Sequence, residues 1–184
     1  MLSPEHRDAL LRVASASIEH GLDQGVPLPI DPEDHAEPLR ATRACFVTLK
    51  RHARLRGCIG HLQAIQPLVR DVAENAFKAA FRDPRFPPLS RVELAGLDLH
   101  ISILTPAEPM TFRSQRDLLT QIRPGIDGLI LEEGTHRGTF LPSVWESLPQ
   151  PETFLRELLQ KAGLRPDYWS DGIRVYRYAT ESFP

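Results

Sequence analysis

Strict alternation of apolar and polar side chains is clearest over residues 97–104, where every second position is leucine or isoleucine. A period of two residues is typical of a half-buried β-strand. Residues 44–50 and 55–60 also alternate, and the polar stretch that separates them predicts a β-hairpin. A second hairpin is predicted over residues 128–141, and a last strand over residues 173–179.

Apolar residues at helical spacing predict several amphipathic helices. The first is expected to begin after Ser3 as N-cap and to stop at Gly21. A second helix, over residues 67–82, carries so wide an apolar face that it is expected to be heavily buried. Two further helices are expected to open at Ser114 and at Pro151.

The order of these elements repeats. Residues 44–104 and 126–179 each read as hairpin, helix and strand, so the sequence predicts two strand-strand-helix-strand units, an order that a duplication would produce. The expected fold class is α+β, with mainly antiparallel sheet covered by helices. A chain of 184 residues can bury one sizeable core. We therefore expect a single domain over 1–184, divisible into subdomains 1–110 and 111–184.

Composition narrows the classes of function. The charged fraction is 25% and the hydrophobic fraction 41%, which are ordinary values for a globular protein. The 22 Lys and Arg residues nearly balance the 24 Asp and Glu residues, so nucleic-acid binding is not expected. No apolar run could span a bilayer, and the first residues do not resemble a secretory signal. We expect a cytoplasmic protein with reduced thiols and no membrane contact.

The segment Leu-Arg-Gly-Cys-Ile-Gly at 55–60 is the main candidate for chemistry. In an extended strand Arg56, Cys58 and Gly60 share one face. Glycine inside a strand often marks a place where a ligand or another backbone approaches closely, which applies to Gly57 and Gly60. Because a neighbouring cation favours the thiolate, Arg56 could activate Cys58 as a nucleophile or redox group.

Two registers of the first hairpin are consistent with the pattern. The preferred register pairs Val47 with Gly57 and puts Phe46 opposite Cys58, which collects the apolar side chains on one side. The rival register puts Cys45 directly opposite Cys58 but mixes core and solvent positions. The preferred register places the two thiols on opposite faces, so no disulfide between them is expected.

Further residues are candidates for the same site. His100 becomes a candidate base for the thiol if the strand over 97–104 lies beside the strand of Cys58. Arg85, in a proline-rich loop, could help to hold an anionic ligand, although such an arginine more often pairs with a nearby carboxylate such as Asp83 or Glu93. The expected ligand-binding set is Gly57, Gly60, Arg85 and Thr48.

No metal site and no cofactor are expected. Cys58 and His61 have a spacing that suits metal ligands, but an extended strand would point them to opposite faces. No glycine-rich phosphate-binding loop and no paired metal signature can be assembled from the sequence.

The chain resembles the AMMECR domain family. The resemblance rests on the segment 55–60 and on Asp-Pro-Arg-Phe at 83–86, supported by segments 46–49, 125–129 and 161–164. It implies a compact α+β domain, found alone in bacteria and archaea and within larger proteins in animals. The family resembles component A of a bacterial set that also includes a Memo-like protein and a radical S-adenosylmethionine (radical-SAM) enzyme, and it implies no established activity.

The chain departs from the family pattern after the motif cysteine. His61 and Leu62 stand where family members commonly have a threonine and an aromatic residue, and Ser143 replaces a usual glutamine. A site role for residues 61 and 143 is therefore not expected.

Two functions remain open from the sequence. The protein could handle a small anionic ligand at the glycine-flanked Cys58, as an enzyme or a binder. Alternatively, it could be a non-enzymatic adaptor that docks a Memo-like protein or a radical-SAM enzyme, with Cys58 structural.

Overall fold

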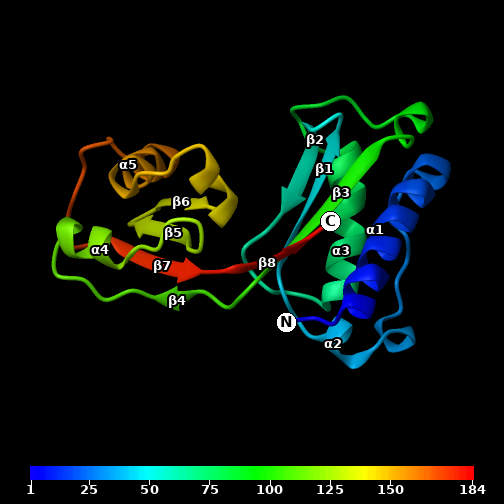
Figure 1. Ribbon diagram of the computed structural model, residues 1–184, viewed down its shortest axis with the longest axis horizontal. Helices are drawn as coiled ribbons and strands as arrows, with labels where there is room; N and C mark the ends of the chain where they lie inside the picture. The colour runs from blue at the N-terminus through cyan, green and yellow to red at the C-terminus, as the bar shows by residue number, and fades with distance from the viewer. The chain divides into compact units, whose positions relative to one another are not determined.

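The computed structural model describes all 184 residues and divides them into two compact units. The first unit comprises Met1–Leu104 together with Glu181–Pro184, and the second comprises Thr105–Thr180. Each unit holds a four-stranded antiparallel sheet with helices (Figure 1), so the predicted α+β fold with mainly antiparallel sheet is confirmed.

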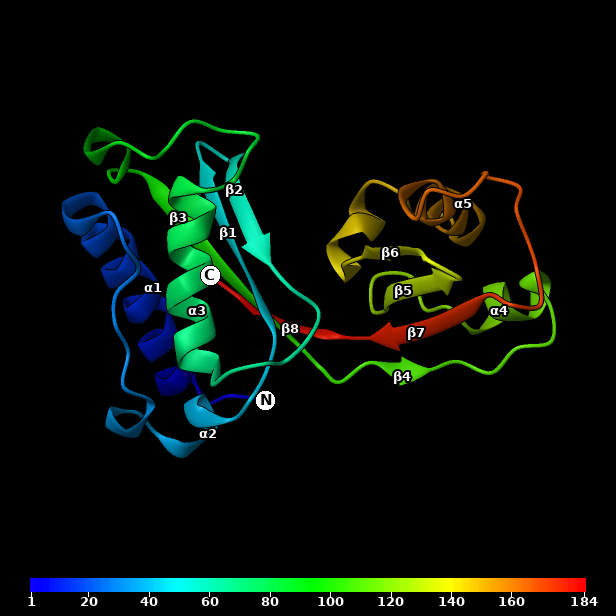
Figure 2. The ribbon, with the colours of Figure 1, turned by 180° about the vertical axis from the view of Figure 1, so that it is seen from behind.

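The first unit builds its sheet in the order β2-β1-β3-β8. Helices α1 and α3 lie side by side on one face of this sheet (Figures 1 and 2), and the four-residue α2 connects α1 to β1. The bounds are α1 Pro4–Gln24, α2 Glu37–Arg40, β1 Cys45–Arg51, β2 Arg54–Gly60, α3 Leu68–Phe81, β3 Leu97–Leu104 and β8 Thr180–Phe183.

The first helix starts as predicted but ends later. The Ser3 side chain accepts a hydrogen bond from the backbone N–H of His6, and Gly25 ends the helix with a φ of 71°. Gly21, the predicted stop, lies inside the helix. A Cβ atom there would come within 2.5 Å of the Phe81 ring, so this glycine serves the packing of α1 on α3.

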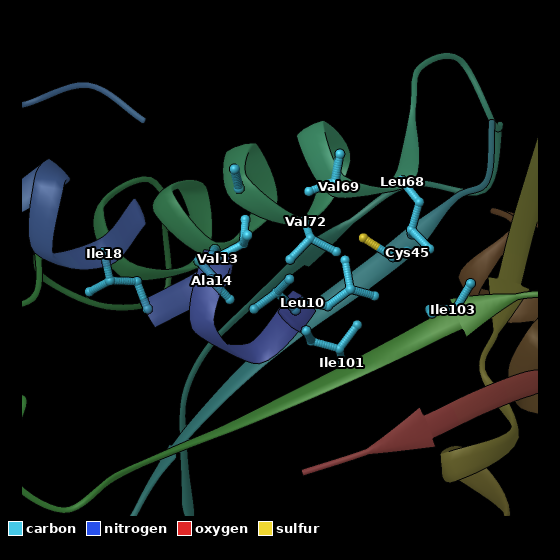
Figure 3. Close-up of a cluster of buried hydrophobic side chains, with 14 of the residues drawn as sticks. Leu10, Val13, Ala14, Ile18, Cys45, Leu68, Val69, Val72, Ile101 and Ile103 are labelled. Atoms are coloured by element: carbon cyan, nitrogen blue, oxygen red, sulfur yellow. The ribbon is translucent and has the colours of Figure 1, made fainter. Parts of the chain in front are cut away.

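The core of the first unit lies between the two helices and the sheet (Figure 3). Leu10 of α1, Val72 of α3 and Ile101 of β3 are fully buried, and the Cys45 thiol lies among them. The apolar face predicted for residues 67–82 is therefore the face that α3 turns to the core.

The register of the first hairpin differs from both predicted registers. Val47 lies opposite Ile59 and Thr48 lies opposite Cys58, two residues beyond the preferred pairing. A shift of two residues keeps the side chains of residues 57–60 on their predicted faces. Leu55 is the exception: the preferred register puts it opposite Leu49 on the core side, but it pairs with Lys50 and is 42% exposed. Cys45 is accordingly buried in the core, Cys58 lies on the opposite face, and both are free thiols.

The cause of the shift is a tight turn followed by a β-bulge. Arg51 pairs with Arg54, so the turn contains only His52 and Ala53, with φ values of 50° and 60°. Such two-residue turns usually carry glycine or asparagine; both are absent here, so no local pattern predicts a turn this short. The bulge between Leu49 and Lys50 then moves the register by one more residue.

The second unit has the sheet order β4-β7-β5-β6, and α5 packs on this sheet. Leu129 and Leu131 of β5 and Phe154 and Leu158 of α5 are fully buried in its core. The bounds are β4 Glu108–Pro109, α4 Gln115–Gln121, β5 Gly128–Glu133, β6 His136–Phe140, α5 Pro151–Lys161 and β7 Arg174–Tyr178.

The two units share a topology. In each, the first strand of the hairpin is flanked by its hairpin partner and by the strand that follows the helix, giving β2-β1-β3 and β6-β5-β7. The two predicted strand-strand-helix-strand units are thus present. The short edge strands were not predicted: β4 follows β3 in the chain but pairs with β7, and β8 follows β7 but joins β3.

Candidate functional site

The two motif segments of the first unit meet at the edge of its sheet. Cys58 lies on the edge strand β2, so its backbone groups have no neighbouring strand on the outer side. Its N–H donates to Asp83 Oδ2 at 2.9 Å, and its carbonyl oxygen accepts from Arg85 Nη2 at 3.2 Å. The side chains of the loop after α3 therefore replace the missing strand at this residue.

Asp83 and Arg85 form a two-pronged ion pair. Arg85 Nε donates to Asp83 Oδ1 at 2.9 Å, and Arg85 Nη2 donates to Oδ2 at 2.7 Å. The Asp83 side chain is only 2% exposed, whereas that of Arg85 is 53% exposed. The hydrogen bond from Arg85, with that from the Cys58 N–H, holds the pKa of Asp83 far below its usual range, and Asp83 raises the pKa of Arg85.

The Cys58 thiol has one hydrogen-bond partner, the Thr48 hydroxyl, with Sγ and Oγ1 3.2 Å apart. Thr48 lies between Cys58 on β2 and His100 on β3 in one cross-strand row. His100 is therefore one strand too far from Cys58, and the condition for its role as a base is not met. No titratable side chain forms a hydrogen bond with the thiol.

The guanidinium of Arg56 binds Glu93 and not the sulfur of Cys58. Its Nε donates to Glu93 Oε1 at 2.7 Å, and its Nη2 donates to Glu93 Oε2 and to the carbonyl oxygen of Pro87. The bonds from Arg56 lower the pKa of Glu93 to about 2. The third nitrogen, Nη1, is buried without a hydrogen-bond partner, and the guanidinium lies 5.9 Å from the centre of the Phe86 ring.

The motif glycines are explained by packing. A Cβ atom on Gly57 would lie 2.1 Å from the carbonyl oxygen of Ala79 in α3. A Cβ atom on Gly60 would lie 2.4 Å from the carbonyl oxygen of Cys45. Both glycines therefore allow a close approach of backbone, as expected, but the approaching backbone belongs to this chain rather than to a ligand.

A second polar cluster centres on Asp71, which the sequence analysis did not single out. This carboxylate is fully buried on the core face of α3. Its donors are the N–H and S–H of Cys45, the Asn75 amide, the Gln66 amide and His61 Nε2, the last at 2.6 Å. The only sequence signal was an aspartate between apolar residues of a heavily buried helix.

His61, for which no site role was expected, is the exposed end of this cluster. Its other ring nitrogen, Nδ1, lies 2.7 Å from the carbonyl oxygen of Gln63. At the other end, burial and the charge of Asp71 raise the pKa of the Cys45 thiol well above its usual value. Every polar atom of the Asp71 carboxylate is satisfied, so the cluster ties β1, α3 and the segment after β2 together.

The geometry limits the chemistry that the Cys58 site and the Asp71 cluster can perform. The structure brings Thr48, Cys58 and Arg85 together, whereas neither Arg56 nor His100 forms a hydrogen bond with the sulfur. Both arginines are already neutralised by carboxylates. No group of three or more His, Cys, Asp or Glu side chains is arranged to hold a metal ion. None of the helices combines the length and the apolar character needed to cross a membrane.

Fold and site together define a class of α+β protein with two sheet-bearing units, in which a Gly-Cys edge strand is sealed by an Asp-Pro-Arg-Phe loop. The chain belongs to the AMMECR1 family, whose sequence profile matches residues 11–183.

Its relatives span nearly its full length. A protein of Methanothermobacter thermautotrophicus is 39% identical over 99% of this chain and 95% of its own. Protein MJ0810 of Methanocaldococcus jannaschii is 38% identical over 100% of this chain and 92% of its own. The crystal structure of the uncharacterized protein PH0010 from Pyrococcus horikoshii is similar with a TM-score of 0.85 and 37% identity, covering 95% of this chain and 88% of that one. None of these names states an activity.

Proposed function

We propose that this protein is a docking module for another protein, not an enzyme that acts through Cys58. One observation carries the proposal: the N–H, the carbonyl oxygen and the thiol of Cys58 each have a partner within the first unit. A nucleophile needs an adjacent base or a cation that is free to stabilise the thiolate. Here the thiol meets a hydroxyl, and the nearby guanidinium groups are bound to carboxylates.

The proposed docking surface lies at the tip of the first hairpin. Leu55 is 42% exposed and Val92 is 80% exposed, and the Arg56–Glu93 ion pair joins the segments that carry them. We call Arg54, Leu55 and Val92 the hairpin-end surface. Arginine next to exposed apolar side chains is typical of interface centres. The basic residues of the turn suit a partner with an acidic rim around an apolar centre.

We propose a Memo-like protein as the partner, with a radical-SAM enzyme as the alternative, on the basis of the family resemblance. The test measures binding of each purified partner to the chain by isothermal titration calorimetry. Val92→Asp is expected to weaken binding about tenfold or more, because it buries a charge in an apolar contact. The matched control is Ile126→Asp, which changes an exposed isoleucine of the second unit and is expected to leave affinity unchanged.

Equal loss in both variants, or no complex with either partner, would contradict the docking proposal. The variant Cys58→Ser provides a second arm. It is expected to retain partner binding, because the docking role does not use the thiol.

A second candidate function is the handling of a small anionic ligand at Cys58. It is favoured by the half-exposed guanidinium of Arg85, which reaches the Cys58 carbonyl oxygen. The rate of Cys58 alkylation against pH, in a Cys45→Ala chain, separates the two. A thiol pKa well below the free value of about 8.5 would support ligand chemistry over docking.

A further inference from the structure

The second unit contains a cavity of about 380 Å³ that the proposed docking role does not use. All of its lining residues belong to the second unit. The lining comes from three segments, which we call the first wall (109–114), the second wall (169–171) and the floor (173–176). The volume lies in the lower part of the range for small-molecule sites.

The first wall is fixed from behind by α4. The Asp117 carboxylate accepts a hydrogen bond from the backbone N–H of Arg113 at 2.8 Å. Gln121 Nε2 donates to the carbonyl oxygen of Thr111 at 3.0 Å. The backbone of this wall is thus held on both sides of Phe112.

The second wall is fixed by one carboxylate of β5. Glu133 Oε1 accepts hydrogen bonds from Tyr168 at 3.0 Å and from Ser170 at 2.8 Å. These two residues flank Trp169, so the indole is positioned without a hydrogen bond of its own. A cavity whose walls are already ordered loses little conformational entropy when a ligand binds.

The apolar part of the lining suits a flat ring. Phe112 and Trp169 contact each other where the two walls meet, with ring centres 5.7 Å apart and planes tilted by 55°. The floor includes Ile173 and Val175, which are buried. Aromatic side chains on an apolar floor favour stacking with an aromatic ligand.

The polar part of the lining is rich in donors. It carries the guanidinium groups of Arg113 and Arg174 against a single carboxylate, Asp171. The Arg113 guanidinium forms no ion pair; the hydrogen bond from the Arg113 backbone N–H and, to a smaller extent, the guanidinium charge lower the pKa of Asp117 behind the wall. Arg174 has only a long contact of 3.8 Å with Glu132.

We propose that this cavity binds a small organic anion with a flat aromatic ring, whose carboxylate or phosphate lies at Arg113 and whose ring lies against Trp169. The site is independent of the hairpin-end surface and of Cys58. Arg113 supplies the charge-assisted hydrogen bond, and the Phe112–Trp169 pair selects a planar group.

Nuclear magnetic resonance of the two tryptophan indole N–H groups tests the proposal in the full chain. The probes are indole-3-carboxylate and adenosine 5′-monophosphate, which separate a carboxylate source from a phosphate source. Indole-3-carboxamide and adenosine are their neutral controls. Trp169 is the reporter, and Trp145 is the internal reference, because its indole N–H is buried and bonded to the carbonyl oxygen of Asp127 at 2.7 Å.

The expected result is a saturable shift of the Trp169 signal with at least one anionic probe, and none for Trp145. Arg113→Gln is expected to weaken this binding about tenfold. Arg116→Gln, an exposed arginine outside the lining, is the matched control and is expected to leave it unchanged. An unchanged Trp145 signal in both variants shows that the unit is folded.

Three results would overturn the proposal. They are no Trp169 shift with either anion at millimolar concentration, equal binding of the neutral analogues, and equal loss of affinity in Arg113→Gln and Arg116→Gln.

Discussion

The carboxylate of Asp83 seals the edge of the first sheet by accepting the backbone N–H of Cys58 at 2.9 Å. The two most specific motif segments of the chain are therefore a single structural unit. An edge strand with unpaired backbone groups is a template for aggregation, and natural sheets cover such edges. Here the cover is a side-chain ion pair, which explains why an Asp-Pro-Arg-Phe loop accompanies the Gly-Cys strand.

Removal of the Asp83 carboxylate is expected to destabilise the protein. Asp83→Ala loses the bond to Cys58 and leaves the buried end of the ion pair empty, so the free energy of unfolding should fall by about 2 kcal/mol. Urea unfolding followed by circular dichroism measures the change. Asp167→Ala, which removes a carboxylate from a long and fully solvated pair with Arg165, is the control and should change stability by less than about 0.5 kcal/mol.

Acid is expected to weaken the same region. The folded-state pKa values of Asp83 and Glu93 lie below their unfolded values of about 4, so these carboxylates stabilise the fold above about pH 5. The stabilisation is lost as the pH falls through the depressed values, which for Glu93 means toward about pH 2. The free energy of unfolding, measured from about pH 5 down to about pH 2, should therefore decrease as the pH decreases.

The matched variant for this pH effect is Glu93→Gln, which should show a shallower fall than the parent chain. Glu157→Gln, at a half-buried position of α5 whose only ion pair is a long contact with Arg156, should leave the slope unchanged. Identical slopes in all three proteins would show that the Arg56–Glu93 pair does not couple to folding.

Gly57 is expected to tolerate substitution less well than Cys58. The added methyl group of Gly57→Ala would overlap the carbonyl oxygen of Ala79, so α3 must move from β2 and stability should fall by about 2–3 kcal/mol. Cys58→Ala removes only a half-buried thiol and should cost about 1 kcal/mol or less. The urea midpoints of the two variants measure this difference. A lower midpoint for Cys58→Ala than for Gly57→Ala would mean that the thiol, and not the glycine, is the structural requirement.

A glycine at the tip of the first hairpin is expected to stabilise the protein. Ala53 has a φ of 60°, which is unfavourable for a residue with a Cβ atom. Ala53→Gly should therefore raise the free energy of unfolding by about 0.5–1 kcal/mol. Ala64→Gly, at an exposed loop position without positive φ, should give no gain, and the difference in melting temperature between the two variants measures the strain.

The two cysteines are expected to differ in reactivity. The pKa of the Cys45 thiol is raised by burial and by Asp71, so this thiol stays protonated and inaccessible until the protein unfolds. Iodoacetamide at mildly alkaline pH should label Cys58 only, as read by peptide mass spectrometry. Labelling of Cys45 at a comparable rate in the folded protein would mean that the Asp71 cluster opens on its own.

Much of the fold could be predicted because it depends on periodicity. The alternation over residues 97–104 and the wide apolar face of residues 67–82 gave β3 and α3 nearly to the residue. Glycines were harder to interpret. Gly21 reads as a helix stop in isolation, and only the ring of Phe81 reveals that it is a packing residue.

The sequence predicted several residues of the candidate site but not which of them contact one another. The assignment of Arg85 to a nearby carboxylate followed from the loop sequence, and Asp83 is its partner. Strand order decided the rest: β1 lies between the strands of Cys58 and His100, and no local pattern encodes that order. The polar turn between β1 and β2 was predicted, but its length of two residues was not, because His52 and Ala53 are not residues that favour such a turn.

The short strand β8 has a consequence for synthesis on the ribosome. It covers β3, and its Glu181 also holds the start of the chain, through the N–H of Leu2 at 2.8 Å and through Arg7. The first unit therefore cannot close until residues 180–183 have left the exit tunnel, although all its other strands are made much earlier. Until then the outer edge of β3 is open, and a strand of a neighbouring copy could pair with it.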